Sequence, residues 1–251
     1  MKTATFALSI FLMATMSSYA QSQSPIETDR PDQTETTSLV PVGRFQGEMG
    51  VEHEQTESNG RDFLIPTALL KFGLFEFLEL RTVLEFANSQ SEDGIEKGLK
   101  PLEIGVKVKL FEEKGLLPAA SLIAQVKLPK MASPDFKVDH AAPEFRLLLQ
   151  HTLSDASNLG YNLGARWDGS STDPEYLYTV SPSYDLSKKV RVFGEAYGFI
   201  QSKHHATQWI DGGFSILLSD NFQIDISSGY ELTHTAGFHN FFEAAGFSFR
   251  I

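Results

Sequence analysis

Cysteine is absent from this sequence of 251 residues, and long apolar runs and basic side chains are scarce. Without cysteine the chain forms neither a disulfide framework nor a thiolate metal site. Lysine and arginine number 21 against 32 acids, a net charge of −11, which argues against nucleic acid and against docking on anionic lipid through a basic patch. After residue 20 no apolar run approaches the roughly 20 residues of a membrane-spanning helix. If the mature chain enters a membrane, it must do so with strands.

The first 20 residues have the pattern of a secretory signal peptide. Lys2 gives a positive start, "ATFALSIFLMATM" is a short apolar stretch, and "SYA" before Gln21 fits a cleavage site of small residues. The apolar stretch is short for a spanning helix, which disfavours the alternative of an anchor helix. We therefore expect three parts, which are a cleaved signal peptide over 1–20, an N-terminal segment over 21–43 and a β domain over 44–251.

From Arg44 onward apolar and polar residues alternate with a period of two. In "PLEIGVKVKL", for example, Ile104 and Val106 point one way while Glu103 and Lys107 point the other. No helical stripe follows the signal peptide, so the chain is predicted to be all-β. Twelve strands are expected, over 44–53, 63–73, 78–87, 100–110, 117–128, 142–153, 159–168, 175–185, 190–201, 208–218, 222–232 and 241–251.

Strand length and the order of the connections distinguish a membrane barrel from a soluble sandwich. Most of the expected strands have about 10–12 residues, near the length of a tilted membrane-crossing strand and well above the 5–6 usual in globular proteins. The odd-numbered connections are longer than the even-numbered ones, as in outer-membrane barrels with long outer loops and short periplasmic turns. The sequence thus predicts an up-and-down antiparallel transmembrane β-barrel of about 12 strands in the outer membrane of a Gram-negative bacterium.

The last expected strand fits closure of such a barrel. In "FFEAAGFSFRI" the residues Phe247, Phe249 and Ile251 share one face, which we expect to meet outer-membrane lipid while the strand pairs with the first one. The pattern also resembles the terminal signal read by the barrel-assembly machinery, with Ile251 in place of the usual aromatic residue. Two prolines, Pro66 and Pro182, fall inside expected strands, where each removes a ladder hydrogen bond, so a bulge is expected at each.

The expected inward face carries charges of both signs. They either line a lumen that conducts or binds small solutes or, as the cost of unpaired buried charge favours for most of them, pair across it and hold the barrel together. Twelve strands lie between eight, which side chains fill, and sixteen, which leave a channel, so a narrow or partly blocked pore is expected. The residues are Glu48, Glu52, Glu79, Arg81, Glu85, Glu103, Lys107, Lys109, Lys127, Glu144, Arg146, Arg166, Asp211, Asp225 and Glu231.

The stretch "IETDRPDQTETTSLVPVGRFQGEMG" before and into the first strand does not alternate. We expect it to fold into the lumen as a plug in which Arg30 pairs with inward acids, Asp29 and Asp32 pair with inward bases, and Glu35 takes part. The alternative is a solvated linker, since chain termini are often loose.

The motifs "TDRPDQTE", "VPVGRFQGEMG", "LLKFGLFEFLELR" and "DGGFSILLSDNFQIDISSGYEL", with the closing "FSFRI", resemble a family of transporter-like bacterial outer-membrane proteins. That family is linked by name to the meta-pathway of phenol degradation. The resemblance covers nearly the whole mature chain and implies an outer-membrane β-barrel with a role in solute passage. It implies no catalytic residues and does not identify the solute.

The histidines leave two interpretations. Six of them lie at or near the expected outer loops, where they are either ordinary polar residues or, if neighbouring loops bring them together, ligands of a metal. No pair has helical ligand spacing, so we expect neither a metal nor a cofactor. The six are His53, His140, His204, His205, His234 and His239.

Three functions compete. The first is an outer-membrane channel for an unidentified small solute. The second is a soluble secreted or periplasmic all-β binding protein, which would be extracted without detergent. The third is an outer-membrane lipid hydrolase with serine, histidine and an acid on the lipid-facing wall. Strand length and the sorting of the connections favour the channel.

Overall fold

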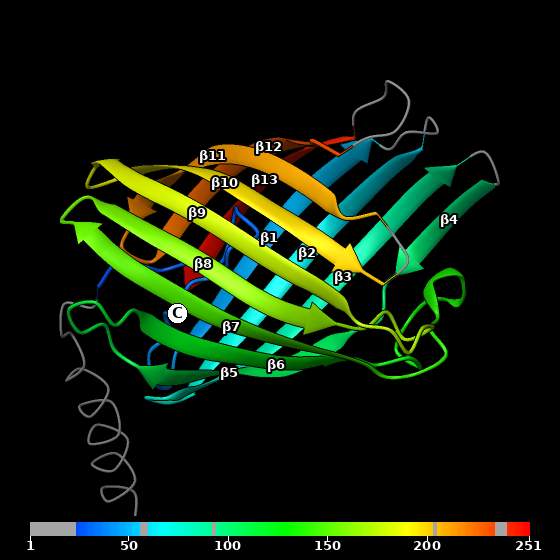
Figure 1. The fold of residues 1–251 in the computed structure, drawn as a ribbon, viewed down its shortest axis with the longest axis horizontal. Coiled ribbons are helices and arrows are strands. Elements are labelled where there is room, and N and C mark those ends of the chain that lie inside the picture. Colours follow the sequence, from blue (N-terminus) through cyan, green and yellow to red (C-terminus); the bar gives the residue numbers. More distant parts are fainter. Residues whose placement is uncertain (1–23, 56–59, 92–93, 203–204, 234–239) are drawn as a thin grey trace, which may run out of the picture.

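The computed structural model describes residues 24–55, 60–91, 94–202, 205–233 and 240–251; the expected signal peptide lies outside them. Their secondary structure is almost entirely strand (Figure 1). In chain order the strands are β1 (Phe45–Gln55), β2 (Arg61–Phe75), β3 (Leu78–Ser91), β4 (Gly94–Leu99), β5 (Glu103–Phe111), β6 (Ala119–Lys127), β7 (Ala142–Ser154), β8 (Ser157–Arg166), β9 (Glu175–Ser187), β10 (Val190–Gln201), β11 (Thr207–Ser219), β12 (Phe222–Glu231) and β13 (Phe241–Arg250). A short 3-10 helix, η2, spans Pro134–Phe136.

The strands form one closed antiparallel barrel. From β5 to β13 each strand pairs with the next in the sequence, and β1 pairs with both β2 and β13. The last residue seals the seam, because Phe45 and Ile251 exchange backbone hydrogen bonds of 3.1 and 2.9 Å. Closure satisfies the backbone groups that an open sheet edge would leave unpaired. Because β4 and β5 both pair with the same edge of β3, they count as one interrupted strand of the wall. The predicted up-and-down barrel of twelve strands is thus confirmed, and a sandwich of two sheets is excluded.

Strands β4 and β5 together make one wall strand that is interrupted at Pro101. Along β3, Phe86 pairs with Leu99 of β4 and Val83 pairs with Glu103 of β5, so the partner gains one residue across the break. Proline has no backbone N–H to give to the ladder. The neighbouring Leu102 amide instead donates to the Met131 carbonyl, in the connection after β6, at 3.0 Å. The predicted strands over 78–87 and 100–110 leave residues 88–99 as a connection, and this expectation was wrong because most of these residues continue β3 or form β4.

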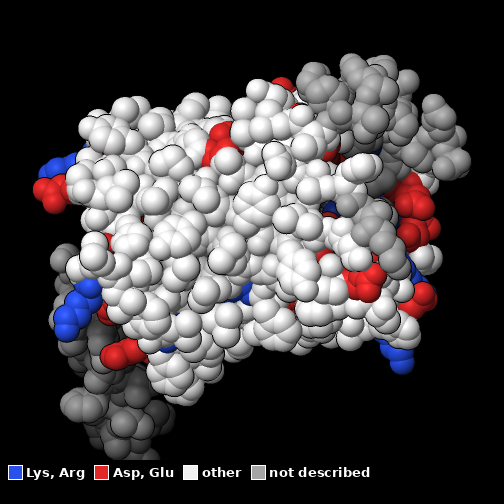
Figure 2. All heavy atoms as spheres, in the orientation of Figure 1, with Lys and Arg blue, Asp and Glu red and all other residues white. Residues whose placement is uncertain are grey.

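The wall is apolar outside and polar inside. Leu80, Ile104 and Phe145 point outward and are 41%, 42% and 49% exposed, whereas Glu79 and Lys107 point inward and are fully buried. On the side shown in Figure 2 uncharged residues cover most of the wall, and most of the charged side chains lie toward its two ends. This distribution is the reverse of that in a water-soluble protein and suits a wall that contacts lipid.

The two prolines inside strands behave differently. At Pro66 the ladders with both β1 and β3 change register, as expected for a bulge. At Pro182 the expected bulge was wrong. Pro182 pairs in register with Leu159, and the ladder with β10 has the same register on both sides of it, from Ser183 with Phe193 to Val180 with Ala196. The position opposite Pro182 is Gly194, and the ladder continues past it without an extra residue.

The connections differ between the two ends of the barrel. At one end, here called the turn end, β7 and β8, β9 and β10, and β11 and β12 are each joined by two residues. At the opposite end, the loop end, the connection from Leu128 to Ala141 joins β6 to β7 and that from Trp167 to Pro174 joins β8 to β9. The predicted sorting of short and long connections is thus present.

Candidate functional site

Residues 24–43, here called the N-terminal segment, lie inside the barrel (Figure 1, dark blue). The segment begins at the turn end, where the Ile26 amide donates to the Asp220 carbonyl at 2.8 Å and Arg250 donates to the Ser24 carbonyl at 2.7 Å. It ends there as well, because Val42 forms an isolated bridge with Gly73 just before β1. The segment therefore enters the lumen, turns back within it and leaves by the same end.

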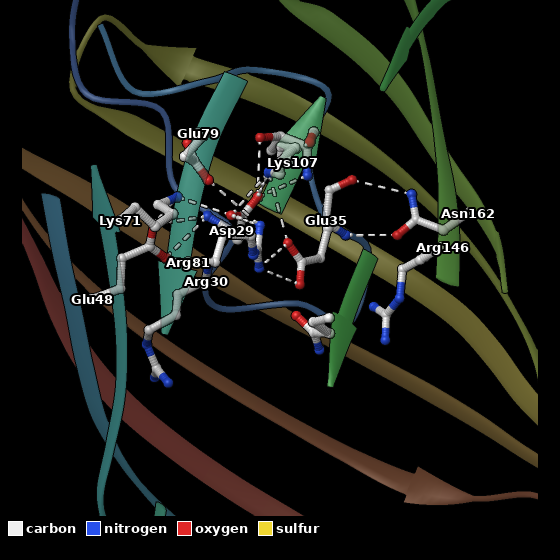
Figure 3. Close-up of polar contacts among 12 residues, drawn as sticks. Asp29, Arg30, Glu35, Glu48, Lys71, Glu79, Arg81, Lys107, Arg146 and Asn162 are labelled. Atoms are coloured by element: carbon white, nitrogen blue, oxygen red, sulfur yellow. Dashed lines mark hydrogen bonds and ion pairs between the residues drawn. The ribbon is translucent and has the colours of Figure 1, made fainter. Parts of the chain in front are cut away.

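Asp29 is the centre of the contacts between the segment and the wall. Its carboxylate accepts hydrogen bonds from Lys71 at 2.9 Å, from Arg81 at 3.2 Å and from Lys107 at 2.9 and 3.0 Å. These three cations come from β2, β3 and β5 and converge on one oxygen pair (Figure 3). All four side chains are almost fully buried. Buried charges are tolerated only when paired and hydrogen-bonded, so Asp29 and its three partners depend on one another.

Two wall carboxylates hold the backbone of the segment. Glu48 accepts the amides of Asp29 and Arg30 at distances between 2.9 and 3.2 Å, and it also forms an ion pair with Lys71. Glu79 accepts the Val40 amide at 2.8 Å. A carboxylate that accepts backbone amides makes the stronger, charge-assisted kind of hydrogen bond. The segment is thus fixed by its main chain as well as by its side chains.

Arg30 rests on the seam between the first and last strands. Its guanidinium donates to Asp225 at 2.9 Å. It lies against Gly50 and Gly246, which face each other across the ladder of β1 and β13. A Cβ atom on either glycine would collide with the guanidinium and force Arg30 to shift, and at Gly246 it would also meet the Met49 carbonyl.

The far side of the segment is held by strands β7 to β10. Glu35 forms an ion pair with Arg81 at 2.6 Å, and its backbone exchanges hydrogen bonds with the Asn162 amide group at 2.8 and 3.1 Å. The Thr34 hydroxyl lies 2.6 Å from that of Thr179. Asp32 contacts the Ser181 hydroxyl at 2.8 Å, and no cation pairs with it among the described residues. The expectation that Asp32 pairs with an inward base was therefore wrong, because the wall beside it carries the Ser181 hydroxyl and the carboxylate of Glu195.

The sequence-predicted charged residues all lie on the lumen side of their strands, but they do two different things. Six contact the N-terminal segment, namely Glu48, Glu79, Arg81, Lys107, Arg146 and Asp225. Others pair along the wall, as Glu103 does with Lys127, Glu144 with Arg146, Arg166 with Glu175, Glu85 with Lys100, and Lys109 with Glu112 at the turn end. Asp211 faces Glu195 across β10 and β11, and Glu231 accepts from Asn240.

The sequence-based set missed many of the wall residues that contact the segment, which are Gln46, Lys71, Ser121, Asn162, Thr179, Ser181, Arg191, Glu195, Gln223, Ser227 and Arg250. Lys71 stands between Leu70 and Phe72, so the period of two in β2 identifies it as inward-facing. Glu195 lies in β10, where aromatic and charged residues share one face; the structure turns this face toward the lumen. Asn162 and Thr179 are neutral, and no sequence pattern distinguishes them from other polar lumen residues.

A cavity of about 710 Å³, here called the vestibule, lies on the loop-end side of the N-terminal segment. A smaller cavity of about 150 Å³ lies on the turn side, and Arg30, Asp32 and Glu35 line both. The segment therefore lies between two spaces of very different size. Eleven carboxylates but only five basic side chains line the vestibule. At its rim, backbone amides of Ser171 and Ser170 donate to Asp168 and keep the pKa of that carboxyl below its ordinary value.

The outer surface carries one polar row near the loop end. Ser228, Glu243 and His53 follow one another across β12, β13 and β1. Glu243 alternates in β13 with the same outward face as Phe247 and Phe249, so it occupies a lipid-facing position near the loop-end rim. A serine nucleophile needs its histidine within hydrogen-bond reach, with the acid behind it. Here the acid is in the middle, and His53 instead stacks on Phe63 with ring centroids 4.6 Å apart.

The histidines do not form a metal centre within the described residues, where no group of three potential ligands has suitable geometry. His204, His234 and His239 lie outside these residues. His140 and His205 lie in separate connections, after β6 and after β10.

Comparisons with known proteins agree on one fold. The family model described as "Putative MetA-pathway of phenol degradation" matches residues 28–251. An outer membrane channel from Pseudomonas putida is similar with a TM-score of 0.69 at 13% identity, over 90% of this chain and 100% of that one. The NanC porin gives 0.57 at 8% identity, over 80% and 98%. The CymD monoaromatic hydrocarbon channel gives 0.50 at 9% identity, over 84% and 89%. No curated protein matches the sequence.

Proposed function

The chain belongs to the family of the MetA-pathway of phenol degradation, and on this basis we propose that it is an outer-membrane channel for small solutes whose bore is set by its N-terminal segment. The single observation that carries the proposal is the lodging of this segment in the lumen through Asp29, Lys71, Arg81 and Lys107. A barrel of twelve strands is wide enough to need such a filling if it is not to remain an open pore.

Membrane placement is supported by the wall itself. Large apolar side chains cover the outside of the barrel and ionic side chains line the inside. In water this arrangement would expose the apolar side chains to solvent, whereas in a membrane they contact lipid. Three solved proteins with this fold have names that describe an outer membrane channel, a porin and a hydrocarbon channel. On this proposal the lipid of the outer membrane and the barrel-assembly machinery are partners, and a soluble binding protein is the less favoured alternative.

The proposal gives the protein no catalytic role. On the lipid-facing wall Ser228 and His53 are separated by β13 and Glu243, which does not suit ester hydrolysis. In the lumen the central ionic side chains are engaged with the N-terminal segment or with one another. They are thus used for holding the segment in place.

Recording in a planar lipid bilayer tests the proposal. The refolded mature chain is expected to give discrete current steps, smaller than those of an unobstructed barrel of this size. Heat-denatured protein serves as the control and should give none. Absence of steps from correctly refolded protein, or recovery of the native protein in the aqueous fraction of lysed cells, would contradict the channel.

A further inference from the structure

One wall of the vestibule is aromatic. Tyr197, Trp209 and Phe242 project inward from β10, β11 and β13 and form a cluster, here called the aromatic shelf, against which Phe199 packs. The rings of Tyr197 and Trp209 are nearly parallel with centroids 6.0 Å apart, and that of Phe242 lies 6.1 Å from Trp209. All four line the vestibule. Tyr197, Trp209 and Phe242 are 5%, 9% and 8% exposed, so the shelf contributes a small aromatic surface to the lining of the cavity.

Carboxylates border the shelf. Glu54 is the register partner of Phe242 across β1 and β13, and Glu52 is the next inward residue on β1. Both line the vestibule, and within the described chain neither accepts a hydrogen bond nor forms an ion pair. On the other side of the shelf Glu231 is the register partner of Trp209, and Asn240 and Thr233 donate to it. Glu52 and Glu54 thus line the vestibule beside the shelf without a partner of their own; Asp211, two residues from Trp209 on β11, also lacks a hydrogen-bond partner among the described residues but does not line the vestibule.

Among the described residues the basic side chains of the vestibule form no ion pair with these two carboxylates, although Lys100 attracts both from a distance and Arg30 attracts Glu52. Each of the five is committed to an acid, in the pairs Arg30 with Asp225, Lys100 with Glu85, Lys127 with Glu103, Arg146 with Glu144, and Arg166 with Glu175. The vestibule therefore carries an excess of negative charge beside an aromatic surface. A bound cation would interact favourably with both the negative charge and the aromatic surface.

Phe199, the ring that packs against the shelf, already receives one cation from the protein. The Arg166 guanidinium lies over the ring of Phe199, 4.4 Å from its centroid. This is the geometry in which the negative face of a ring attracts a positive charge. The contact indicates that the electrostatics of this aromatic group favour cations, and Tyr197, Trp209 and Phe242 extend the same surface toward Glu54.

We propose that the aromatic shelf with Glu52 and Glu54 is a binding site for organic cations, meaning a protonated or quaternary amine that carries an apolar body. The ammonium group lies against the shelf and the two carboxylates, and the apolar body occupies the rest of a cavity that is large enough for a small molecule. The inference rests on the proposed function, because a channel open toward the loop end is what lets such a ligand reach the vestibule.

Binding of three probes of similar shape tests the site. Benzyltrimethylammonium, benzyl alcohol and benzoate are titrated into the refolded protein in micelles, with calorimetry and tryptophan fluorescence as readouts. Trp167→Phe leaves Trp209 as the remaining tryptophan, so that quenching reports on the shelf. The cation is expected to bind at least about tenfold more tightly than the neutral alcohol, and benzoate weakest, because a desolvated cation–π contact and two carboxylates act together.

The carboxylates are tested by neutralisation. The double variant Glu52→Gln/Glu54→Gln is expected to weaken the ammonium probe about fivefold or more and to leave benzyl alcohol unchanged. The matched control is Glu112→Gln, which removes a charge at an exposed turn-end position and should change neither. Equal affinity for cation and alcohol, or an equal response of the double variant and the control, would overturn the site.

Bilayer recordings of the same preparations separate the two ideas. Discrete currents together with no preference for the cation would leave the channel standing and refute the site. Absence of current together with selective, Glu54-dependent binding would refute the channel and retain a cation site in the barrel. Loss of both would refute both.

Discussion

At the scale of single residues, Asp29 has the most demanding environment in the protein. Its carboxylate forms ion pairs with three buried cations that come from three strands. The wall carboxylates Glu48 and Glu79 pair with Lys71 and Arg81. Among the described residues Lys107 forms ion pairs only with Asp29 and Glu35 of the N-terminal segment, so the charges of the wall are fully paired only when the segment is in place. The arrangement ties the stability of the lumen to the position of one side chain.

Replacing Asp29 with Asn tests this dependence. Removal of one partner from a buried ion cluster costs about 3–5 kcal/mol, so Asp29→Asn is expected to loosen the segment and to raise single-channel conductance and current noise. Asp32→Asn is the control, because Asp32 meets a serine hydroxyl and no cation among the described residues, and it should change conductance far less. Identical recordings from the two variants would show that the cation cluster does not hold the segment.

Some residue-level features follow from the sequence and others do not. The alternation within strands places Glu48, Arg81, Lys107 and Asp225 on the inner face without a structure. Which inner residue meets which residue of the segment depends on the path of an irregular stretch, and no periodicity encodes that path. The aromatic shelf was not predicted for a related reason. Its rings come from three strands, and the register between strands is not written in the pattern of any one of them.

At the scale of elements, the barrel wall was largely predictable and its interruption was not. Long strands are recognised in the sequence by apolar and polar residues that alternate with a period of two. Closure of the barrel follows from the need to pair every sheet edge. The stretch "GIEKGL" of β4 has two glycines and no clear alternation, and Pro101 then separates it from β5. Local sequence signals therefore suggest a loop where pairing with β3 and the connection after β6 stabilises a strand.

The N-terminal segment can be locked to the wall as an element. Thr34 and Thr179 have hydroxyl oxygens 2.6 Å apart, and the native chain has no cysteine, so Thr34→Cys/Thr179→Cys introduces a single pair of thiols at side chains that are in contact. Introduced into Asp29→Asn, the oxidised pair is expected to restore wild-type conductance, and reduction should bring the higher conductance back.

The controls for the disulfide are the two single cysteine variants, whose conductance should not change on addition of oxidant or reductant. If the oxidised double variant keeps the elevated conductance of Asp29→Asn, the extra current does not come from movement of the segment away from β9.

At the scale of the whole molecule, charge is distributed by compartment. The outer wall is apolar, the middle of the lumen is filled with paired charges, and the vestibule has more acids than bases. Fixed negative charge concentrates cations in a narrow, partly desolvated space. Ion passage through the protein should therefore favour cations over anions.

Reversal potentials under a potassium chloride gradient measure this preference. The expected sign is that of a cation-selective pore, and the selectivity should fall as ionic strength rises, because salt screens the vestibule charges. Glu52→Gln/Glu54→Gln should reduce the selectivity, and Glu112→Gln should not. An anion-selective potential would be incompatible with the charge distribution of the vestibule.

The central claim is that the N-terminal segment sets the bore of the barrel. Its most direct test is the single-channel conductance of the mature chain with residues 24–38 deleted, measured beside the intact chain in the same bilayer. We predict a severalfold larger conductance, as expected when a twelve-stranded barrel loses the filling that lies between its two cavities. Equal conductance in a deletion variant that still folds as a barrel would contradict the claim.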